Sequence, residues 1–278
     1  AQLRGAMAAT AARIPEWKPT SLLDLGSGPG TALWAAAEQW PAIRTMVAWE
    51  REAAFVALGR ELAAASGSAA VRGTTWQRKD LERLDAGPER RYDLVVLGHV
   101  LNELRPEARQ AVVEFAWRST SGLLLIVEPG TSAAFPVVRA ARDHLLTLEA
   151  HTIAPCAHDR PCPLAGDWCH FPQRVVRPDF QRRARSAPSP WEDSKFSYAA
   201  MARFAAPEPI WARIIDDPAS NKAYAQVKVS SQDGIARLQA LKRHREAFRS
   251  IRSLLWGDTL SEPPAPPVTA IADTAKEA

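Results

Sequence analysis

The 278-residue sequence predicts an α/β protein built on a doubly wound, mostly parallel sheet. Two observations carry this prediction. Short apolar runs alternate with helical stretches over the first 150 residues, and a glycine-rich turn follows the first of those runs. Continuous apolar strands that alternate with helices are typical of a sheet covered on both faces. The composition, with 46% hydrophobic and 24% charged residues, is that of an ordinary globular protein that can bury one sizeable core.

The first 150 residues show this alternation most clearly. Expected strands cover residues 22–25, 44–50, 70–80, 91–100 and 122–130, and expected helices cover residues 31–40, 51–66, 104–119 and 133–152. No run of about 18 apolar residues occurs, so we expect no membrane-spanning helix. No segment signals oligomerisation.

The pattern changes in the second half of the chain. Residues 151–200 are rich in Pro, Arg and Cys and lack periodicity, which predicts an insertion organised by something other than a hydrophobic core. Residues 201–258 are expected to complete the core sheet, with a β-hairpin formed by 209–216 and 222–230 and a basic helix at about 234–255. Residues 259–278 are rich in Pro and Ala, and we expect them to be disordered.

The glycine-rich turn reads LDLGSGPG, residues 23–30. Its glycines permit a tight turn and a close approach of a ligand to the backbone, and the next helix offers free N–H groups. An acidic residue at the end of the second strand can hold the ribose hydroxyls of a nucleoside. An acid after the third strand is placed for an adenine contact or for capping a helix. The expected cofactor-binding residues are Asp24, Gly26, Gly28, Gly30, Glu50 and Asp80.

The spacing of these glycines narrows the choice of ligand. No P-loop lysine follows them, and the third glycine does not fit the G-x-G-x-x-G pattern of dinucleotide enzymes. The form D-x-G-x-G-x-G with a downstream acid is the pattern of class I S-adenosylmethionine methyltransferases, which predicts a seven-stranded sheet with residues 1–150 as its cofactor-binding core. The alternative is a structural turn in a ligand-free sheet.

The segment after the fourth strand bears on catalysis. It reads GHVLNEL, residues 98–104, and lacks the Asn/Asp-Pro-Pro-aromatic tetrad that many methyltransferases acting on base nitrogens carry there. His99 is either a general base or a structural histidine. Catalytic residues are therefore left unassigned, and methyl transfer is an open expectation.

All three cysteines of the chain lie in one polar, proline-rich loop. Cys156, Cys162 and Cys169 are separated by five and six residues, and an odd number of thiols does not form a disulfide framework. Three cysteines in such a loop indicate a bound metal in a reducing compartment. Their spacing leaves an iron–sulfur cluster and a zinc site open, because His158 or His170 could complete a Cys3His zinc site.

Basic side chains are concentrated in residues 174–186 and 235–252, although the net charge of the chain is only +4. Clustered arginines favour phosphate contacts, and the alternative is a solvated helix face. The expected nucleic-acid contacts are Arg174, Arg177, Arg182, Arg183, Lys242, Arg243 and Arg245, with Arg185 in the same run.

Six segments carry a resemblance to a known family. They read LDLGSGPGTALWAA, GHVLNEL, VEPGT, APCAHDRPCPL…WCHFPQRV, KFSY and LLWGD. They stand in the same order as in the small-ribosomal-subunit methyltransferase-like family, across roughly residues 5–258. The chain thus resembles the bacterial relatives of the mitochondrial small-subunit assembly factor.

This resemblance implies a function. It implies an S-adenosylmethionine-binding protein associated with the small ribosomal subunit and its rRNA, acting in rRNA methylation, subunit assembly or translation. The expected location is the cytoplasm in a bacterium and the mitochondrial matrix in a eukaryote. Two alternatives are a small-molecule methyltransferase with merely solvated basic segments, and a catalytically inactive, iron–sulfur-dependent ribosome-binding module.

The resemblance also favours iron–sulfur over zinc. Eukaryotic members of the family are associated with a [4Fe–4S] cluster held by four cysteines, which implies that Cys156, Cys162 and Cys169 are three of the ligands. The fourth family cysteine aligns with Ser230 or Ser231, and serine is a poor replacement for a soft thiolate.

Overall fold

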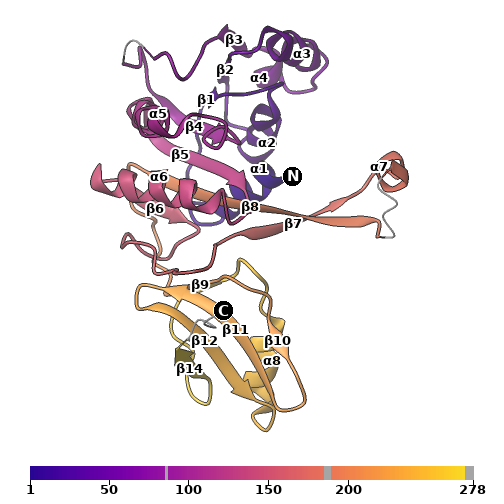
Figure 1. Cartoon of the computed structure of the whole chain (residues 1–278), viewed down its shortest axis with the longest axis vertical. Coiled ribbons are helices and arrows are strands. Elements are labelled where there is room, and N and C mark those ends of the chain that lie inside the picture. Colours follow the sequence, from indigo (N-terminus) through magenta and orange to yellow (C-terminus); the bar gives the residue numbers. More distant parts are fainter. Residues whose placement is uncertain (85–86, 185–188, 273–278) are drawn as a thin grey trace.

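Two stacked units follow one another along the chain in the computed structural model (Figure 1). The structure describes residues 1–84, 87–184 and 189–272. The larger unit is a sheet between two layers of helices, and the smaller unit, drawn in yellow and orange, is an antiparallel sheet with one helix.

The larger unit contains an eight-stranded sheet. Seven of its strands lie in the order β3-β2-β1-β4-β5-β8-β6, and β7 pairs with the outer part of β8. The first five strands are parallel, whereas β8 runs antiparallel to both β5 and β6. This order with one reversed strand is the topology of class I methyltransferases and confirms the predicted fold class. The strands are β1 Ser21–Leu25, β2 Thr45–Glu50, β3 Thr75–Arg78, β4 Tyr92–Gly98, β5 Thr120–Pro129, β6 His151–Ala154, β7 Phe171–Val176 and β8 Trp191–Ala202.

Helices cover both faces of this sheet, as the apolar strands predict. Neighbouring residues of β1 point to opposite faces, so that Leu22 packs with the first helices and Leu23 packs with the later ones. One face is covered by α1, α2, α3 and α4, and the other by α5 and α6. These helices are α1 Gln2–Ala11, α2 Thr31–Gln39, α3 Ala53–Ala64, α4 Ala69–Arg72, α5 Pro106–Arg118 and α6 Phe135–Thr147.

The smaller unit has its own sheet and its own core. Its strands lie in the order β13-β9-β11-β12-β14, and β10 pairs with β11. Helix α8, Arg245–Ser253, packs on this sheet through Phe248 and Ile251. The strands are β9 Ala212–Ile214, β10 Ala219–Ser220, β11 Tyr224–Ser231, β12 Gly234–Leu241, β13 Thr259–Leu260 and β14 Thr269–Ala272.

The prediction that residues 201–258 complete the core sheet is wrong. The strand that completes it is β8, whose residues 196–202 are all buried between β5 and β6. Residues 196–202 were not predicted to form a strand, because they adjoin a stretch rich in Pro and Arg that lacks periodicity. The core sheet thus extends beyond residue 150 to Ala202, and residues 151–200 contribute three of its strands.

Two further expectations for the second half also fail. Residues 234–241 form a strand, because the Asp233-Gly234 turn, with φ of 118° at Gly234, pairs them with β11, and Leu238 and Ala240 alternate with more exposed residues. The helix covers only Arg245–Ser253. The expected disordered tail contains β13 and β14 of the second sheet, while residues 273–278 lie outside the described part of the chain.

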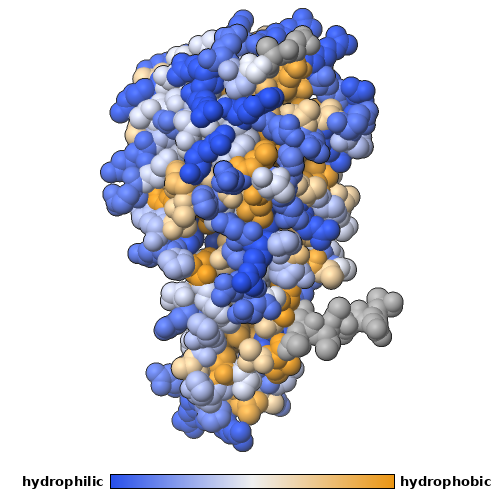
Figure 2. Space-filling model, turned by 90° about the vertical axis from the view of Figure 1, so that its left-hand side faces the viewer, coloured by the Kyte–Doolittle hydropathy of each residue, from blue (hydrophilic) through white to orange (hydrophobic). Residues whose placement is uncertain are grey.

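Two features of the surface matter for function. An arm made of β7, the outer half of β8 and helix α7, Asp179–Ala184, projects from the body (Figure 1). In a view turned by 90°, much of the surface is hydrophilic, and hydrophobic patches appear on both units (Figure 2). None of the helices in the described ranges has the length and apolar character needed to cross a membrane.

Candidate functional site

The glycine-rich turn lies where β1 ends, at the edge where the parallel strands of the sheet present their carboxyl ends. Gly26, Gly28 and Gly30 adopt φ of 71°, 52° and 95°, values that L side chains rarely take. The amides of Gly26 and Ser27 donate to the carbonyl of Trp49, at 2.8 and 2.9 Å, and tie the turn to β2.

The three glycines serve different purposes. A Cβ on Gly26 would lie 2.5 Å from Val100, and a Cβ on Gly30 would lie 2.8 Å from Trp76, so these two permit close packing. A Cβ on Gly28 would meet nothing within 4 Å. Gly28 therefore faces open space, where a ligand can approach the backbone.

Two carboxylates stand beside this turn. Glu50 is buried and accepts hydrogen bonds from the amides of Gly28, at 2.8 Å, and Glu52, at 2.7 Å. Asp24 is 2% exposed, and its Oδ2 has no hydrogen-bond partner within the described residues. Burial, and secondarily the charge of Glu50, raises the pKa of Asp24 to about 7. A buried carboxylate oxygen without a donor suits a cationic or hydrogen-donating ligand.

These groups line one cavity of about 530 Å³, a volume in the range of small-molecule and cofactor sites. Asp80 also lines it, and its carboxylate accepts from the amide of Glu82 at 3.0 Å and lies 3.6 Å from Arg83. Asp80 thus organises its own turn in addition to facing the cavity. The structure therefore brings all the sequence-predicted acids together at one site, beside Gly26 and Gly28.

His99 and its neighbours form another wall of the cavity. His99 has φ of 61°, and burial lowers the pKa of its imidazole, which favours the neutral ring. The loop after it is held by Glu128, which accepts from the amides of Val100, at 3.0 Å, and Leu101, at 2.7 Å. Glu128 is fully buried, and burial outweighs these hydrogen bonds and raises its pKa to about 7. The role of Glu128 is not predicted by the sequence, where its only signal is its place at the end of β5.

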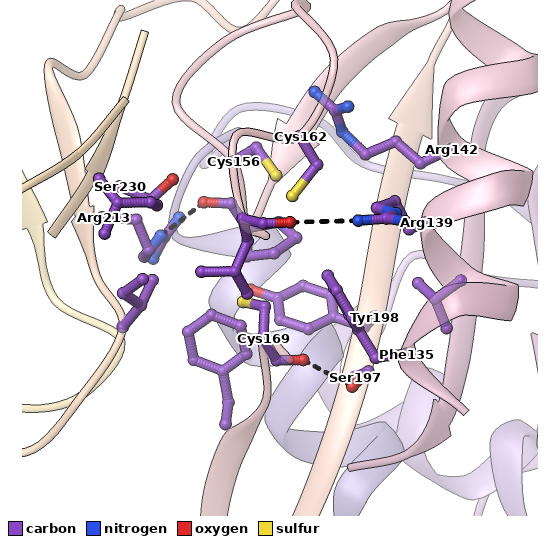
Figure 3. A pocket seen from close by; sticks show the side chains of 16 residues that line it. Phe135, Arg139, Arg142, Cys156, Cys162, Cys169, Ser197, Tyr198, Arg213 and Ser230 are labelled. Atoms are coloured by element: carbon purple, nitrogen blue, oxygen red, sulfur yellow. Dashed lines mark hydrogen bonds between the residues drawn. The ribbon is translucent and has the colours of Figure 1, made fainter. Parts of the chain in front are cut away.

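The three cysteines converge on a second cavity, at the junction of the two units. Cys156, Cys162 and Cys169 line this cavity of about 40 Å³. They reach it from the loop between β6 and β7, whereas Arg213 and Ser230 enter from β9 and β11 of the smaller sheet (Figure 3). Desolvation raises the pKa of Cys156 and raises that of Cys169 well above the usual value.

Arginines hold the cysteine loop in place. Arg142 of α6 donates to the carbonyls of His158, at 2.6 Å, and Arg160, at 3.0 Å. Arg139, also of α6, donates to the carbonyl of Leu164 at 3.2 Å (Figure 3). These bonds connect the loop to the helical layer of the larger unit.

Arg213 makes the corresponding connection from the smaller unit. It is 4% exposed and donates to the carbonyls of Pro155, at 2.7 Å, and Gly257, at 2.6 Å. Its Nη2, like Nε of Arg142, has no hydrogen-bond partner within the described residues. Three arginines line the cavity, and no carboxylate belongs to its described lining. Arg142 pairs with Asp143 at 2.9 Å, but the buried charge of Arg213 also needs compensation, so the cavity suits an anionic group.

The candidate fourth ligands differ in their position relative to the cysteine cavity. Ser230 lines the cavity, whereas Ser231 accepts from the amide of Asp233 at 3.1 Å and lies outside the lining. Neither His158 nor His170 is among the described lining residues. No group of three His, Cys, Asp or Glu side chains within the described ranges has the arrangement expected for a single metal ion.

The basic residues fall into two groups. On the arm, Arg174 pairs with Asp193, Arg177 with Glu192 and Arg182 with Asp179, at 3.0, 3.0 and 3.1 Å. Arg183 is exposed on α7, and Arg185 lies outside the described residues.

The second group lies at the start of α8 in the smaller unit. Lys242, Arg243 and Arg245 are exposed there, and Arg249 and Arg252 extend the same helix surface. No ion pair within the described ranges joins these five residues to an acid. Their charges are thus more available to phosphate than those of the arm.

Arg142 and Arg213 were missed in the sequence. Arg142 stood within an amphipathic helix, and Arg213 within an apolar run that was assigned to the core sheet. Only the packing of the smaller unit against the cysteine loop places Arg213 beside the thiols.

Comparison with known proteins gives one family match and curated relatives. The family model described as mitochondrial small ribosomal subunit Rsm22 matches residues 1–261. The chain is 31% identical over 269 residues to the ribosome assembly protein METTL17, mitochondrial, of Homo sapiens, covering 90% of this chain and 57% of that protein. It is 26% identical over 226 residues to the Rsm22-cox11 tandem protein 2, mitochondrial, of Schizosaccharomyces pombe, covering 64% of this chain and 30% of the relative. The chain thus spans little more than half of the human relative and less than a third of the yeast one.

Solved structures show a looser likeness. The methyltransferase domain of bacterial CtHen1-CN aligns with a TM-score of 0.47 and 9% identity, over 72% of this chain and 97% of that one. The assignment of the fold rests on the strand order of the chain itself.

Proposed function

Because this chain belongs to the mitochondrial small ribosomal subunit Rsm22 family, we propose that it binds S-adenosylmethionine and acts in assembly of the small ribosomal subunit. The observation that carries the cofactor proposal is the cavity at the end of β1, where Gly28 faces open space beside the unpartnered oxygen of Asp24. The ribosomal partner follows from family membership and from the relative named as a ribosome assembly protein.

The cavity residues fit S-adenosylmethionine group by group. Asp24 would accept hydrogen bonds from the cationic amino group of the methionine part, Glu50 would hold the ribose hydroxyls, and Asp80 would lie on the adenine side. The turn at Gly28 leaves room for the ligand against the backbone. When bound, this cofactor supplies an electrophilic methyl group. His99, with a neutral ring facing the cavity, is the residue of this wall that could accept a proton.

The charge of the cavity mouth bears on the methyl acceptor. Six acids line the cavity, against two cationic side chains. An acidic surface of this kind repels phosphates. It therefore supports a second candidate function beside rRNA methylation, namely methyl transfer to a small acceptor that is uncharged or cationic. The acids are Asp24, Glu50, Glu52, Asp80, Glu82 and Glu103, and the cations are Arg51 and Lys79.

One measurement tests the binding of the cofactor, and a second tests the transfer of its methyl group to rRNA. Isothermal titration calorimetry should detect binding of S-adenosylmethionine and its loss in the Glu50→Ala variant, and no binding to the wild-type protein would refute the proposal. Mass mapping of small-subunit rRNA from a deletion strain and its parent then decides whether methyl transfer to rRNA occurs. A methyl group missing in the deletion strain alone supports transfer, and identical maps support a role in assembly without it.

For the cysteine cavity we propose an iron–sulfur cluster, with Cys156, Cys162 and Cys169 as ligands. A single zinc ion draws all its ligands to one point, at roughly 2.3 Å for thiolates, whereas a cluster places each thiolate on a different iron. All three thiols line one cavity, and the resemblance to a family associated with a [4Fe–4S] cluster favours the cluster over zinc. Three thiolates make such a centre anionic, which would compensate the buried charge of Arg213, whereas Arg142 already pairs with Asp143 at 2.9 Å.

The metal is identified by one experiment on anaerobically purified protein. Brown protein with broad absorption and matching iron and sulfide contents would support the cluster, whereas colourless protein with one zinc per chain would overturn it. Cys162→Ser, purified in the same way, should contain much less iron than the wild type.

For rRNA we propose the basic surface of the smaller unit as the main phosphate contact, through Lys242, Arg243 and Arg245. The paired arginines of the arm are less available. Binding should weaken steeply with added salt, and an affinity for small-subunit rRNA that does not depend on salt would contradict this proposal. A eukaryotic source would place the protein in the mitochondrial matrix, in keeping with the names of the curated relatives, and a bacterial source would place it in the cytoplasm.

A further inference from the structure

The projecting arm carries hydrophobic side chains that are exposed to solvent. It consists of β7 and the outer half of β8, in register from Phe171 opposite Phe196 to Val176 opposite Trp191, with α7 beyond (Figure 1). Phe180 of α7 is 74% exposed, Val176 is 64% exposed and Trp191 is 50% exposed. Phe180 is the most exposed large hydrophobic residue in the described chain.

The register places Val176 and Trp191 next to the guanidinium group of Arg174. Val176 and Trp191 face each other across the two strands, and the next pair on the same face is Arg174 with Asp193. Arg174 and Asp193 form an ion pair at 3.0 Å, and Arg183 is exposed on α7. One face of the arm therefore combines the exposed indole of Trp191, the aliphatic side chain of Val176 and the planar guanidinium group of Arg174.

The arm as a whole is cationic. Its described residues between 171 and 195 include five cations, namely Arg174, Arg177, Arg182, Arg183 and Lys195. They include three acids, namely Asp179, Glu192 and Asp193, each of which already accepts from an arginine. Charge complementarity thus favours an anionic partner, and the exposed rings favour one that has flat apolar faces.

We propose that the tip of the arm binds unpaired nucleotides of RNA, with bases stacked on Phe180 and Trp191 and phosphates near Arg183. Stacking needs bases that are free of a duplex, so the arm selects single-stranded loops or ends. The arginines that are paired with acids contribute less to phosphate binding, so the rings supply most of the affinity at this site. This inference rests on the proposed RNA-binding function and assigns the arm a role distinct from that of α8.

The test compares two RNA probes in the full chain. Phe180→Ala with Trp191→Ala should weaken binding of a short single-stranded RNA by about 30-fold or more, as expected for losing two stacked bases. Binding of a duplex of the same sequence should not change, and neither should the salt dependence, because no charge is removed. Leu58→Ala, which removes a 42%-exposed side chain from α3 on another surface, is the matched control and should behave as wild type.

The possible outcomes distinguish failure of the arm proposal from failure of the proposed RNA-binding function. Unchanged affinity of the double variant for single-stranded RNA overturns the arm proposal and leaves RNA binding by α8 intact. Loss of a ribosomal protein from assembly particles without any change in RNA affinity also overturns it, in favour of a protein partner. Failure of the wild-type chain to bind either probe overturns the arm proposal together with the RNA-binding function. An unchanged unfolding midpoint confirms that the double variant is folded.

Discussion

The buried carboxylate of Asp24 predicts that binding of S-adenosylmethionine depends on pH. In the free protein, burial raises the pKa of Asp24 to about 7, so this carboxyl group is protonated below neutral pH. The cationic amino group of the ligand binds the ionised form. Affinity should therefore be nearly full above about pH 8 and should fall as the pH drops through 7.

The size of this effect follows from the pKa. Between about pH 7.5 and about pH 5.5, the ionised fraction of a carboxyl group with a pKa of about 7 falls about 25-fold, which corresponds to about 2 kcal/mol of binding free energy. Asp24→Asn is nearly isosteric and does not ionise. It should bind more weakly at pH 7.5 and show no such dependence.

The assay is isothermal titration calorimetry across this pH range, with 5′-methylthioadenosine as the control ligand. That compound lacks the amino and carboxyl groups, so its affinity should not depend on Asp24. A flat pH profile for the wild type, or an equal pH dependence in Asp24→Asn, would refute the assignment.

The same carboxyl group should affect stability with the opposite sign. A raised carboxyl pKa in the folded chain means that the folded state is favoured while Asp24 is protonated and loses stability as the pH rises from about 4 to about 7. In ligand-free protein at about pH 8, Asp24→Asn should therefore unfold with a free energy on the order of 4 kcal/mol higher than that of the wild type. Chemical denaturation at two pH values measures this difference.

Three further predictions concern the metal site and the RNA surface. Ser230→Cys should add a fourth thiolate and raise the iron retained after purification, measured by metal analysis, whereas Ser231→Cys, outside the cavity, should not. Charge reversal of Lys242 and Arg245 should reduce the slope of log affinity for small-subunit rRNA against log salt by roughly one for each phosphate that the protein no longer neutralises, while Arg174→Glu should change the slope less because its charge is already paired. Chelation of the metal under reducing conditions should loosen the junction between the units, which limited proteolysis of the smaller sheet would detect, and an unchanged digestion pattern would argue against a joining role.

The expected cofactor site could be read from the sequence because it is local. Asp24 and the glycines lie within seven residues, and Glu50 ends the next strand, so the parallel pairing of β1 and β2 brings them together. Glu128 lies behind this site and holds the loop after Gly98 that lines it, through hydrogen bonds across 26 to 28 residues. No local pattern marks such a contact.

The strand that closes the main sheet shows where pattern reading failed. Residues 196–202 are buried and mostly small or apolar, and they follow directly after a polar half that belongs to the arm. One strand thus has two environments, buried in the sheet and exposed in the arm, and the sequence of the exposed half suggested a loop. The hairpin of the smaller unit was recognised as strands, but periodicity does not tell which sheet a strand joins.

The fold class, the cofactor turn and the three clustered thiols could be inferred without any structure, because each depends on residues close together in the chain. The packing of the two units established that the smaller sheet is separate, that Ser230 rather than Ser231 faces the thiols, and that Arg213 lies beside them with an unpartnered nitrogen. These contacts join segments about 45 to 75 residues apart, and burial and charge compensation, not local propensity, select their arrangement.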